Sequence, residues 1–364
     1  MTLPAQISIS VFSNEFGIIF VFPVLVIGPV DDYAPPIQAR KDKLQGGLLA
    51  GGFNEASCIS RYQSVLYRKE SLHKASPYLI LRLRSYEALH KRCGPYTKSY
   101  NKTLEKLKTG DHLESTDCNY LVWISFSGLG NRILTLASAF LYALMNHVLL
   151  VDPGDMVDLF CEPFLEVSWF LPLDFPLTRQ FSSLDKKSLH CYGKILKSNT
   201  FANSNRSISS SFVYLHLVHD YDDQDKLFFC DQDQTSLQKV SWLIMKSDNY
   251  FVPSLFLIPS FEQELGNLFP RKETVFHFLG RYLLHPTNES LGGLKPWILY
   301  KPENRTVPDP PCCRVMSMEP CFHAPPFYDC KAKRGIDTGA VVPYVRHCED
   351  MSWGLKLVDN ESEL

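Results

Sequence analysis

The stretch NYLVWISFSGLGNRILTLASAFLYALMNHVLLVD, residues 119–152, decides the fold class of this chain of 364 residues. Residues 119–125 are typical of a strand, residues 133–145 of a strongly apolar helix, and residues 147–152 of a second short strand. Strand, helix and strand in this order predict a βαβ unit, whose two strands are parallel. The expected fold is therefore of the α/β class.

The pattern continues on both sides of this unit. Upstream, residues 60–70 and 76–94 predict helices, and the second of them stops at Gly94-Pro95. Downstream, residues 212–220 and 240–247 are apolar runs that predict further buried strands. The unit at residues 119–152 is thus part of a larger α/β domain.

The segment GLGNR, residues 128–132, lies between the predicted strand and the predicted helix. Gly128 and Gly130 would let the backbone approach a ligand, and a helix N-terminus offers N–H groups to a phosphate or a sugar hydroxyl. The guanidinium of Arg132 is unfavourable there unless a polar or anionic group pairs with it. We therefore expect Gly128, Gly130, Asn131 and Arg132 to bind substrate; a tight turn without a ligand is the alternative.

Two groups of carboxylates follow the later strands. Asp248 comes directly after the run at 240–247, where burial can raise the pKa of a carboxylate into the range of a general base; an Asx turn between two strands is the alternative. Residues 220–225, DYDDQD, contain overlapping D-x-D patterns, which some glycosyltransferases use to hold a divalent metal. A solvated acidic loop is the simpler interpretation of that segment.

Composition indicates a secreted or lumenal protein with a small ligand. The net charge of -2 excludes a whole-molecule field for nucleic acid or anionic lipid. Eleven cysteines without a CxxC pair predict disulfides in an oxidising compartment, with an unpaired thiol expected at Cys312-Cys313. Asn-x-Ser/Thr sequons agree with this, and we expect glycosylation at Asn101, Asn205 and Asn304.

Both ends of the chain differ in character from the α/β part. Residues 16–30 form an apolar run, shorter than a spanning helix and without a preceding Lys or Arg, which predicts a buried strand or an uncleaved signal anchor. The prolines that follow it indicate a stem, so residues 1–41 are the anchor and stem candidate. Residues 301–330 are rich in proline and cysteine and predict a disulfide-pinned surface segment; zinc bound by His323, His347 and cysteines is the alternative.

Several long strings in order resemble the plant xyloglucan-type galactoside 2-alpha-L-fucosyltransferase family. Among them are DKLQGGLLAGGFNEASCISRYQSVLYRK (42–69), VWISFSGLGNRILTLASAFLYAL (122–144), HLVHDY (216–221), DNYFVPSLFLIP (248–259), GGLKPWILYKPENRT (292–306) and VRHCEDMSWGLKLVD (345–359). The resemblance covers nearly all of the chain from Asp42 to Asp359.

This resemblance implies a single-pass type II Golgi membrane enzyme of GT-B architecture, with two Rossmann-like lobes and the lumenal active site between them. Such enzymes transfer L-fucose from GDP-fucose to the 2-hydroxyl of galactose on a cell-wall polysaccharide, with inversion and without a required metal. It assigns to Asp248 the polarisation of the acceptor hydroxyl, directly or through a water, and makes the acids at 220–225 structural. A homodimer, or pairing with full-length relatives, is a further expectation.

One stretch of the family pattern is missing. In the family a long segment separates the HPTN string from GGLKPWILY; it holds most of the second lobe and an Ile-Gln-Val-Arg motif whose arginine contacts the donor diphosphate. Here only Glu289 stands between HPTN (285–288) and SLGGLKPW (290–297). We expect an intact first lobe at 42–288 and a truncated second lobe at 289–364.

The missing stretch predicts little or no transferase activity, because it removes the cationic group expected to neutralise the departing GDP. The main alternative is an inactive remnant that binds glycans or regulates a partner. A metal-dependent glycosyltransferase using residues 220–225 is a second alternative, and a sequence that lacks a segment of the natural product is a third.

Overall fold

The computed structural model describes residues 11–13, 19–21, 43–62, 71–110, 117–199, 210–290, 328–331 and 334–335. The expectations for Asn205, Asn304, the Cys312-Cys313 pair, His323 and His347 lie outside the described residues, as do those for most of residues 16–30 and 301–327.

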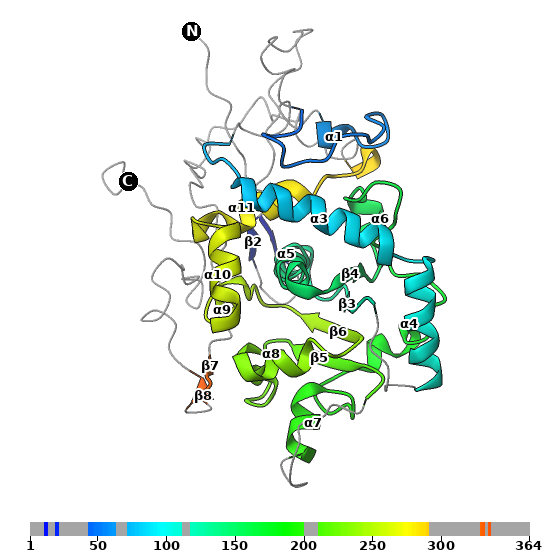
Figure 1. Ribbon diagram of the computed structural model, residues 1–364, viewed down its shortest axis with the longest axis vertical. Helices are drawn as coiled ribbons and strands as arrows, with labels where there is room; N and C mark the ends of the chain where they lie inside the picture. Colours follow the sequence, from blue (N-terminus) through cyan, green and yellow to red (C-terminus); the bar gives the residue numbers. More distant parts are fainter. Residues whose placement is uncertain are drawn as a thin grey trace, which may run out of the picture.

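A four-stranded parallel sheet with the order β4-β3-β6-β5 forms the centre of the lobe (Figure 1). Its strands are β3 (Tyr120–Trp123), β4 (Val148–Val151), β5 (Val213–Leu217) and β6 (Trp242–Ser247). In the register, Tyr120 pairs with Val148 on one side and with Trp242 on the other. The predicted βαβ unit and the parallel sheet are therefore confirmed.

Both faces of the sheet are covered, which explains why its strands are apolar at nearly every position. Alternate residues such as Leu121 and Leu243 face α5 (Leu129–Asn146), which Figure 1 shows end-on between the sheet and α3 (Pro77–Cys93). The other residues of the strands, such as Val122 and Ile244, face α4 (Lys98–Thr109) and the segment at 171–191.

The helix predicted over residues 76–94 is confirmed as α3. Ser76 is its N-cap, and the Ser76 hydroxyl accepts the N–H of Leu79 at 3.0 Å. Pro77 stands at the first helical position, where no N–H is needed. Gly94 ends the helix, as the sequence predicts. Of the helix predicted at 60–70, the structure describes the beginning, as α1 (Ile59–Tyr62).

Two local predictions are wrong in detail. The helix α5 begins at Leu129, four residues before the predicted 133, so Gly130, Asn131 and Arg132 lie in its first turn. The apolar run after Asp248 is helical rather than a second strand: it forms α9 (Val252–Leu255) and α10 (Pro259–Leu268). Prolines are tolerated in the first turn of a helix, so Pro253 and Pro259 start these helices rather than break a strand.

The remaining helical segments are short, apart from α11 (Val275–Leu283), which packs on α5. They are α6 (Met156–Leu159), η1 (Thr178–Ser183), α7 (Tyr192–Asn199), η2 (Asp225–Phe229), α8 (Asp231–Leu237) and η3 (Lys272–Thr274). Two small antiparallel pairs complete the structure: β1 (Val11–Ser13) with β2 (Ile19–Val21), and β7 (Tyr328–Asp329) with β8 (Arg334–Gly335). None of the helices within the described ranges is both long enough and apolar enough to cross a bilayer.

Three disulfides fasten the described chain: Cys58–Cys161, Cys93–Cys118 and Cys230–Cys330. The third joins the loop before α8 to the end of the segment rich in proline and cysteine, which confirms that this end is pinned. It also shows that Cys330 is not a zinc ligand. Among the cysteines that the structure describes, Cys191 is buried and free.

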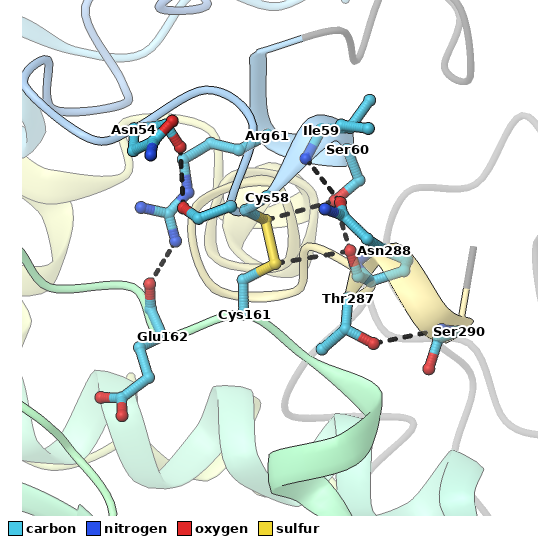
Figure 2. Close-up of a disulfide and its surroundings, with 12 residues drawn as sticks. Asn54, Cys58, Ile59, Ser60, Arg61, Cys161, Glu162, Thr287, Asn288 and Ser290 are labelled. Carbon is cyan, nitrogen blue, oxygen red and sulfur yellow. Dashed lines mark hydrogen bonds between the residues drawn. A yellow bond between two sulfur atoms is a disulfide. The ribbon is translucent and has the colours of Figure 1, made fainter. Parts of the chain in front are cut away.

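Figure 2 shows that the Cys58–Cys161 disulfide is the centre of a clamp, which we define as residues 54–62, 158–162 and 285–290. The side chain of Asn288 accepts the N–H of Ile59 at 2.9 Å and donates to the carbonyl of Ala56 at 2.7 Å. The Thr287 hydroxyl donates to the carbonyl of Asp158 at 2.7 Å. Asn288, which also begins an Asn-x-Ser sequon with Glu289 and Ser290, is therefore part of the packing of the lobe, with both ends of its side-chain amide occupied.

Candidate functional site

The carboxyl ends of the four parallel strands meet at one edge of the sheet. In open α/β sheets this edge is where ligands bind. The polar residues that follow the strands there are Ser125 after β3, Asp152 after β4, His219 after β5 and Asp248 after β6. Because β6 lies between β3 and β5, the segment after β6 is at the middle of this edge.

Asp248 is nearly buried, with 9% of its side chain exposed, and both of its carboxylate oxygens contact one residue. The backbone N–H of His219 donates to Oδ1 at 2.9 Å, and Nδ1 of the His219 ring lies 2.5 Å from Oδ2. The His219 side chain is 73% exposed. Asp248 is therefore covered by an imidazole that faces solvent.

The two loops that carry this pair are bound to each other. The Ser247 hydroxyl and the Asn249 side-chain amide both donate to the carbonyl of Leu217, at 2.9 and 3.3 Å. These hydrogen bonds fix the end of β6 against the end of β5. Tyr221 is close enough to sense the charge of Asp248. Burial, and after it the negative charge of Asp248, raises the pKa of the Tyr221 phenol. The pair is thus held on a rigid support.

The predicted substrate-binding segment lies on the same edge, beside β6. The N–H of Ile124 donates to the carbonyl of Met245 at 2.8 Å, and the ammonium of Lys246 lies 4.4 Å from the centre of the Phe126 ring. The left-handed backbone conformation falls on Ser127, with φ of 69°, whereas Gly128 is extended with φ of -66°. The turn before α5 therefore takes its left-handed residue from Ser127 and not from a glycine.

Arg132 already has an anionic partner within the protein. Its guanidinium forms an ion pair with Asp155, and its side chain is only 15% exposed. Asn131 donates to the Ser127 hydroxyl at 3.1 Å. The sequence indicates that the Arg132 guanidinium requires a polar or anionic partner, and the Asp155 carboxylate is that partner. Substrate binding by Gly128, Gly130, Asn131 and Arg132 stays a prediction.

Asp152, directly after β4, is a further carboxylate on this edge. Burial raises the pKa of Asp152, and a hydrogen bond from the backbone of Ser125 acts in the opposite direction. This contact joins the end of β4 to the segment after β3, so Asp152 helps to shape the edge.

The acids at 220–225 are paired with groups of the protein. Asp220 contacts His216 and Lys186, Asp222 pairs with Lys197, and Asp223 pairs with Lys226. Asp225 is buried, and its Oδ1 accepts the Cys191 thiol and the N–H of Gly193, each at 3.2 Å. Within the described part of the chain no cluster of His, Cys, Asp and Glu has the arrangement of a metal site. The geometry favours the structural interpretation of these acids.

Sequence reasoning placed Asp248 but missed His219. The signal was present in the HLVHDY string, where a histidine directly follows a buried strand. His219 meets Asp248 because β5 and β6 are adjacent in the sheet. The order of the strands along the chain does not predict this adjacency. Of the glycosylation candidates, Asn101 lies exposed on α4.

Comparison with solved structures places this fold in a known class. A mutant of Arabidopsis thaliana FUT1 in complex with GDP matches with a TM-score of 0.74 and 46% sequence identity, covering 87% of this chain and 100% of that chain. The described lobe therefore has the fold of a GT-B-like glycosyltransferase.

Sequence comparisons identify the family. The profile of the xyloglucan fucosyltransferase family matches residues 27–290 and 288–331. A galactoside 2-alpha-L-fucosyltransferase of Pisum sativum is 48% identical, covering 91% of this chain and 84% of the relative; one of Arabidopsis thaliana is 46% identical, covering 88% and 84%. This chain belongs to the xyloglucan fucosyltransferase family, a family of glycosyltransferases.

The same comparisons locate the interruption in the family pattern. The two matched segments meet at 288–290, where the sequence predicts a missing stretch. The alignment with the pea relative has 480 positions. Since 480 exceeds the 364 residues of the chain by 116, at least 116 positions hold no residue of this chain.

Proposed function

We propose that this chain transfers L-fucose from GDP-fucose to the 2-hydroxyl of a galactose residue on xyloglucan or a related cell-wall polysaccharide. The observation that carries the proposal is Asp248, a nearly buried carboxylate fixed at the ligand-binding edge of the sheet. The names of the relatives support the reaction, and the GDP in the complex of the solved relative supports the donor.

The chemistry needs a group that removes a proton from the acceptor hydroxyl as its oxygen attacks C1 of fucose. The bond from C1 to the diphosphate oxygen breaks, and GDP departs with the electron pair. The edge near Asp248 supplies the proton acceptor. The proposal requires no metal, and the pairing of Asp220 with Lys186 and of Asp222 with Lys197 supports this.

The interruption at 288–290 bears on the donor side of the reaction. The resemblance assigns donor diphosphate contacts to a motif in the missing stretch, and loss of one preorganised donor to a developing anion typically lowers kcat by about 10²–10³-fold. We therefore expect transfer at a rate far below that of the pea relative. A homodimer, or a pair with a full-length relative, is the arrangement in which another chain would supply the second lobe.

We also propose a location in the Golgi, as a single-pass type II membrane protein with the described lobe in the lumen. The disulfides support an oxidising compartment, because such bonds are rare in the cytosol. The exposed sequon at Asn101 is accessible to glycosylation there.

A transfer assay tests the function. The purified full chain is incubated with GDP-fucose and either galactosylated xyloglucan or the same polysaccharide after enzymatic removal of galactose, and calorimetry measures GDP binding in parallel. Fucose found in α(1→2) linkage only on the galactosylated polymer supports the proposal. Binding of xyloglucan without GDP binding or transfer supports the glycan-binding alternative instead. Absence of both transfer and GDP binding contradicts the proposal that this chain is a working fucosyltransferase.

A further inference from the structure

The contacts of Asp248 raise the question of which group touches the acceptor. Both carboxylate oxygens are engaged by His219, and only 9% of the Asp248 side chain is exposed. An acceptor hydroxyl that approaches from solvent meets the imidazole first, because the His219 side chain is 73% exposed. We propose that His219 is the catalytic base that removes the proton of the acceptor 2-hydroxyl, and that Asp248 is a positioning residue for it.

The hydrogen-bond chemistry of the pair sets the state of the ring. An ionised carboxylate only accepts hydrogen bonds, so the contact from Nδ1 to Asp248 Oδ2 requires a proton on Nδ1. In the neutral imidazole, Nε2 then carries the lone pair. Within the described ranges no hydrogen bond of the protein occupies Nε2 of His219. The pair therefore presents a proton acceptor to solvent at the ligand-binding edge.

The step balances without a further reactant. Nε2 takes the proton of the galactose 2-hydroxyl while the oxygen forms the bond to C1 of fucose, and GDP leaves with the electrons of the broken bond. The imidazolium that forms is stabilised by the Asp248 carboxylate on the other ring nitrogen, as in other histidine–aspartate arrangements. The inference rests on the proposed function, since it needs that reaction.

The groups around the pair are fixed by other contacts, which leaves His219 as the exposed one. On β5 itself, the His216 side chain is buried and contacts Tyr214 and Asp220. On β6, Ser247 and Asn249 donate to the carbonyl of Leu217. These contacts hold the backbone of both loops, so the ring of His219 has a defined place above Asp248.

Two substitutions separate a base from a structural partner. In His219→Asn, the side-chain amide can still donate to Asp248 from a place close to Nδ1, but it has no basic nitrogen. We expect kcat for fucose transfer to fall by about 10²–10⁴-fold, the usual contribution of a general base, with KM changed less than about threefold. Asp220→Asn is the matched control, because it changes another histidine–aspartate contact of the same strand, and we expect kcat within about threefold of the parent. Retention of most activity by His219→Asn overturns the proposal.

A second measurement decides the proposal if the chain itself transfers no fucose. Nitrogen NMR of the histidine side chains reports which ring nitrogen of His219 carries the proton, with His219→Asn as the assignment control. We expect the Nδ1–H tautomer in the parent, its loss in Asp248→Asn, and a shift of the Nε2 signal on addition of galactosylated xyloglucan oligosaccharide but not of the degalactosylated one. An Nε2–H tautomer in the parent overturns the role of His219 whatever the transfer assay gives. An Nε2 signal that does not shift on addition of the galactosylated oligosaccharide overturns it as well.

Discussion

Two histidine–aspartate pairs have their histidines at or just after the end of β5, and they differ in what surrounds them. His216 is buried at the end of β5, and both of its ring nitrogens are occupied: Nδ1 by the Tyr214 hydroxyl at 2.9 Å and Nε2 by Asp220 at 2.7 Å. In the pair three residues later the burial is reversed, with a nearly buried Asp248 and an exposed His219. The same two residue types thus make a structural contact in one pair and an exposed proton acceptor in the other.

The difference shows why composition alone misleads at this site. Residues 220–225 have more carboxylates than any other short segment after a strand, yet lysines and N–H groups of the protein pair with them. Asp248 is a single carboxylate whose sole ion-pair partner in the described part of the chain is His219. The combination of a nearly buried carboxylate with an exposed imidazole, rather than the number of acids, distinguishes the candidate site.

The strongest test of this comparison is a double-mutant cycle on the exposed pair. If Asp248 acts through His219, then Asp248→Asn and His219→Asn remove one function, and the double variant should lose about as much kcat as the more damaging single variant. We expect each single loss to be at least about 10²-fold. Steady-state kinetics of the four proteins measures it. Losses that multiply in the double variant would show that the two residues act independently.

The buried pair should respond in stability instead. Tyr214→Phe removes the hydroxyl that contacts Nδ1 of His216 and the carbonyl of Leu184. Leaving buried polar groups without partners costs about 1–3 kcal/mol, so we expect the free energy of unfolding to fall by that amount. Denaturant unfolding followed by fluorescence measures it. Tyr221→Phe, a change of the same kind beside the exposed pair, serves as the comparison. An equal loss of unfolding free energy in Tyr221→Phe would contradict the expectation that only the buried pair responds in stability.

The smallest expected effect concerns the acid of the buried pair. Burial alone would raise the pKa of Asp220, but the contacts from His216 and Lys186 outweigh it and lower the pKa to about 2. A lowered pKa contributes stability above the unfolded value near 3.9, and this contribution is lost as pH falls toward about 2.

Asp220→Asn should therefore cost less than about 1 kcal/mol at neutral pH, because Asp220 is 46% exposed and solvent screens its contacts. The difference from the parent should shrink between about pH 4 and pH 2, the interval between the unfolded and folded pKa values. Unfolding curves of both proteins across this interval measure it. A difference that stays constant with pH would mean that the carboxylate charge does not stabilise the fold.

The βαβ unit and the capped helix α3 could be predicted because their signals are local. Apolar runs of strand length around a long apolar helix, and Ser76 and Gly94 at the ends of α3, act within a few residues. The helices after Asp248 could not be predicted this way, since Pro253 and Pro259 suit both a broken strand and a helix start. In the structure this segment packs residues such as Phe251 and Leu255 into the core, through contacts that are not local in the sequence.

The candidate site divides in the same way. Asp248 could be found because a carboxylate after a buried strand is a pattern of neighbouring residues. The role of Asp155 as the partner of Arg132, and the contact of His219 with Asp248, join residues 23 and 29 positions apart. Such pairings depend on the order of strands in the sheet, which one sequence does not specify.

The clamp around the Cys58–Cys161 disulfide has a consequence for how the chain could be rebuilt. Its hydrogen bonds from Thr287, Asn288 and Ser290 fasten the lobe at the point where the two family segments meet. A segment inserted after Ser290 would start from an anchored residue, and none of the hydrogen bonds within the clamp would have to open. We therefore expect an insertion after Ser290 to leave the hydrogen bonds of the lobe before it in place.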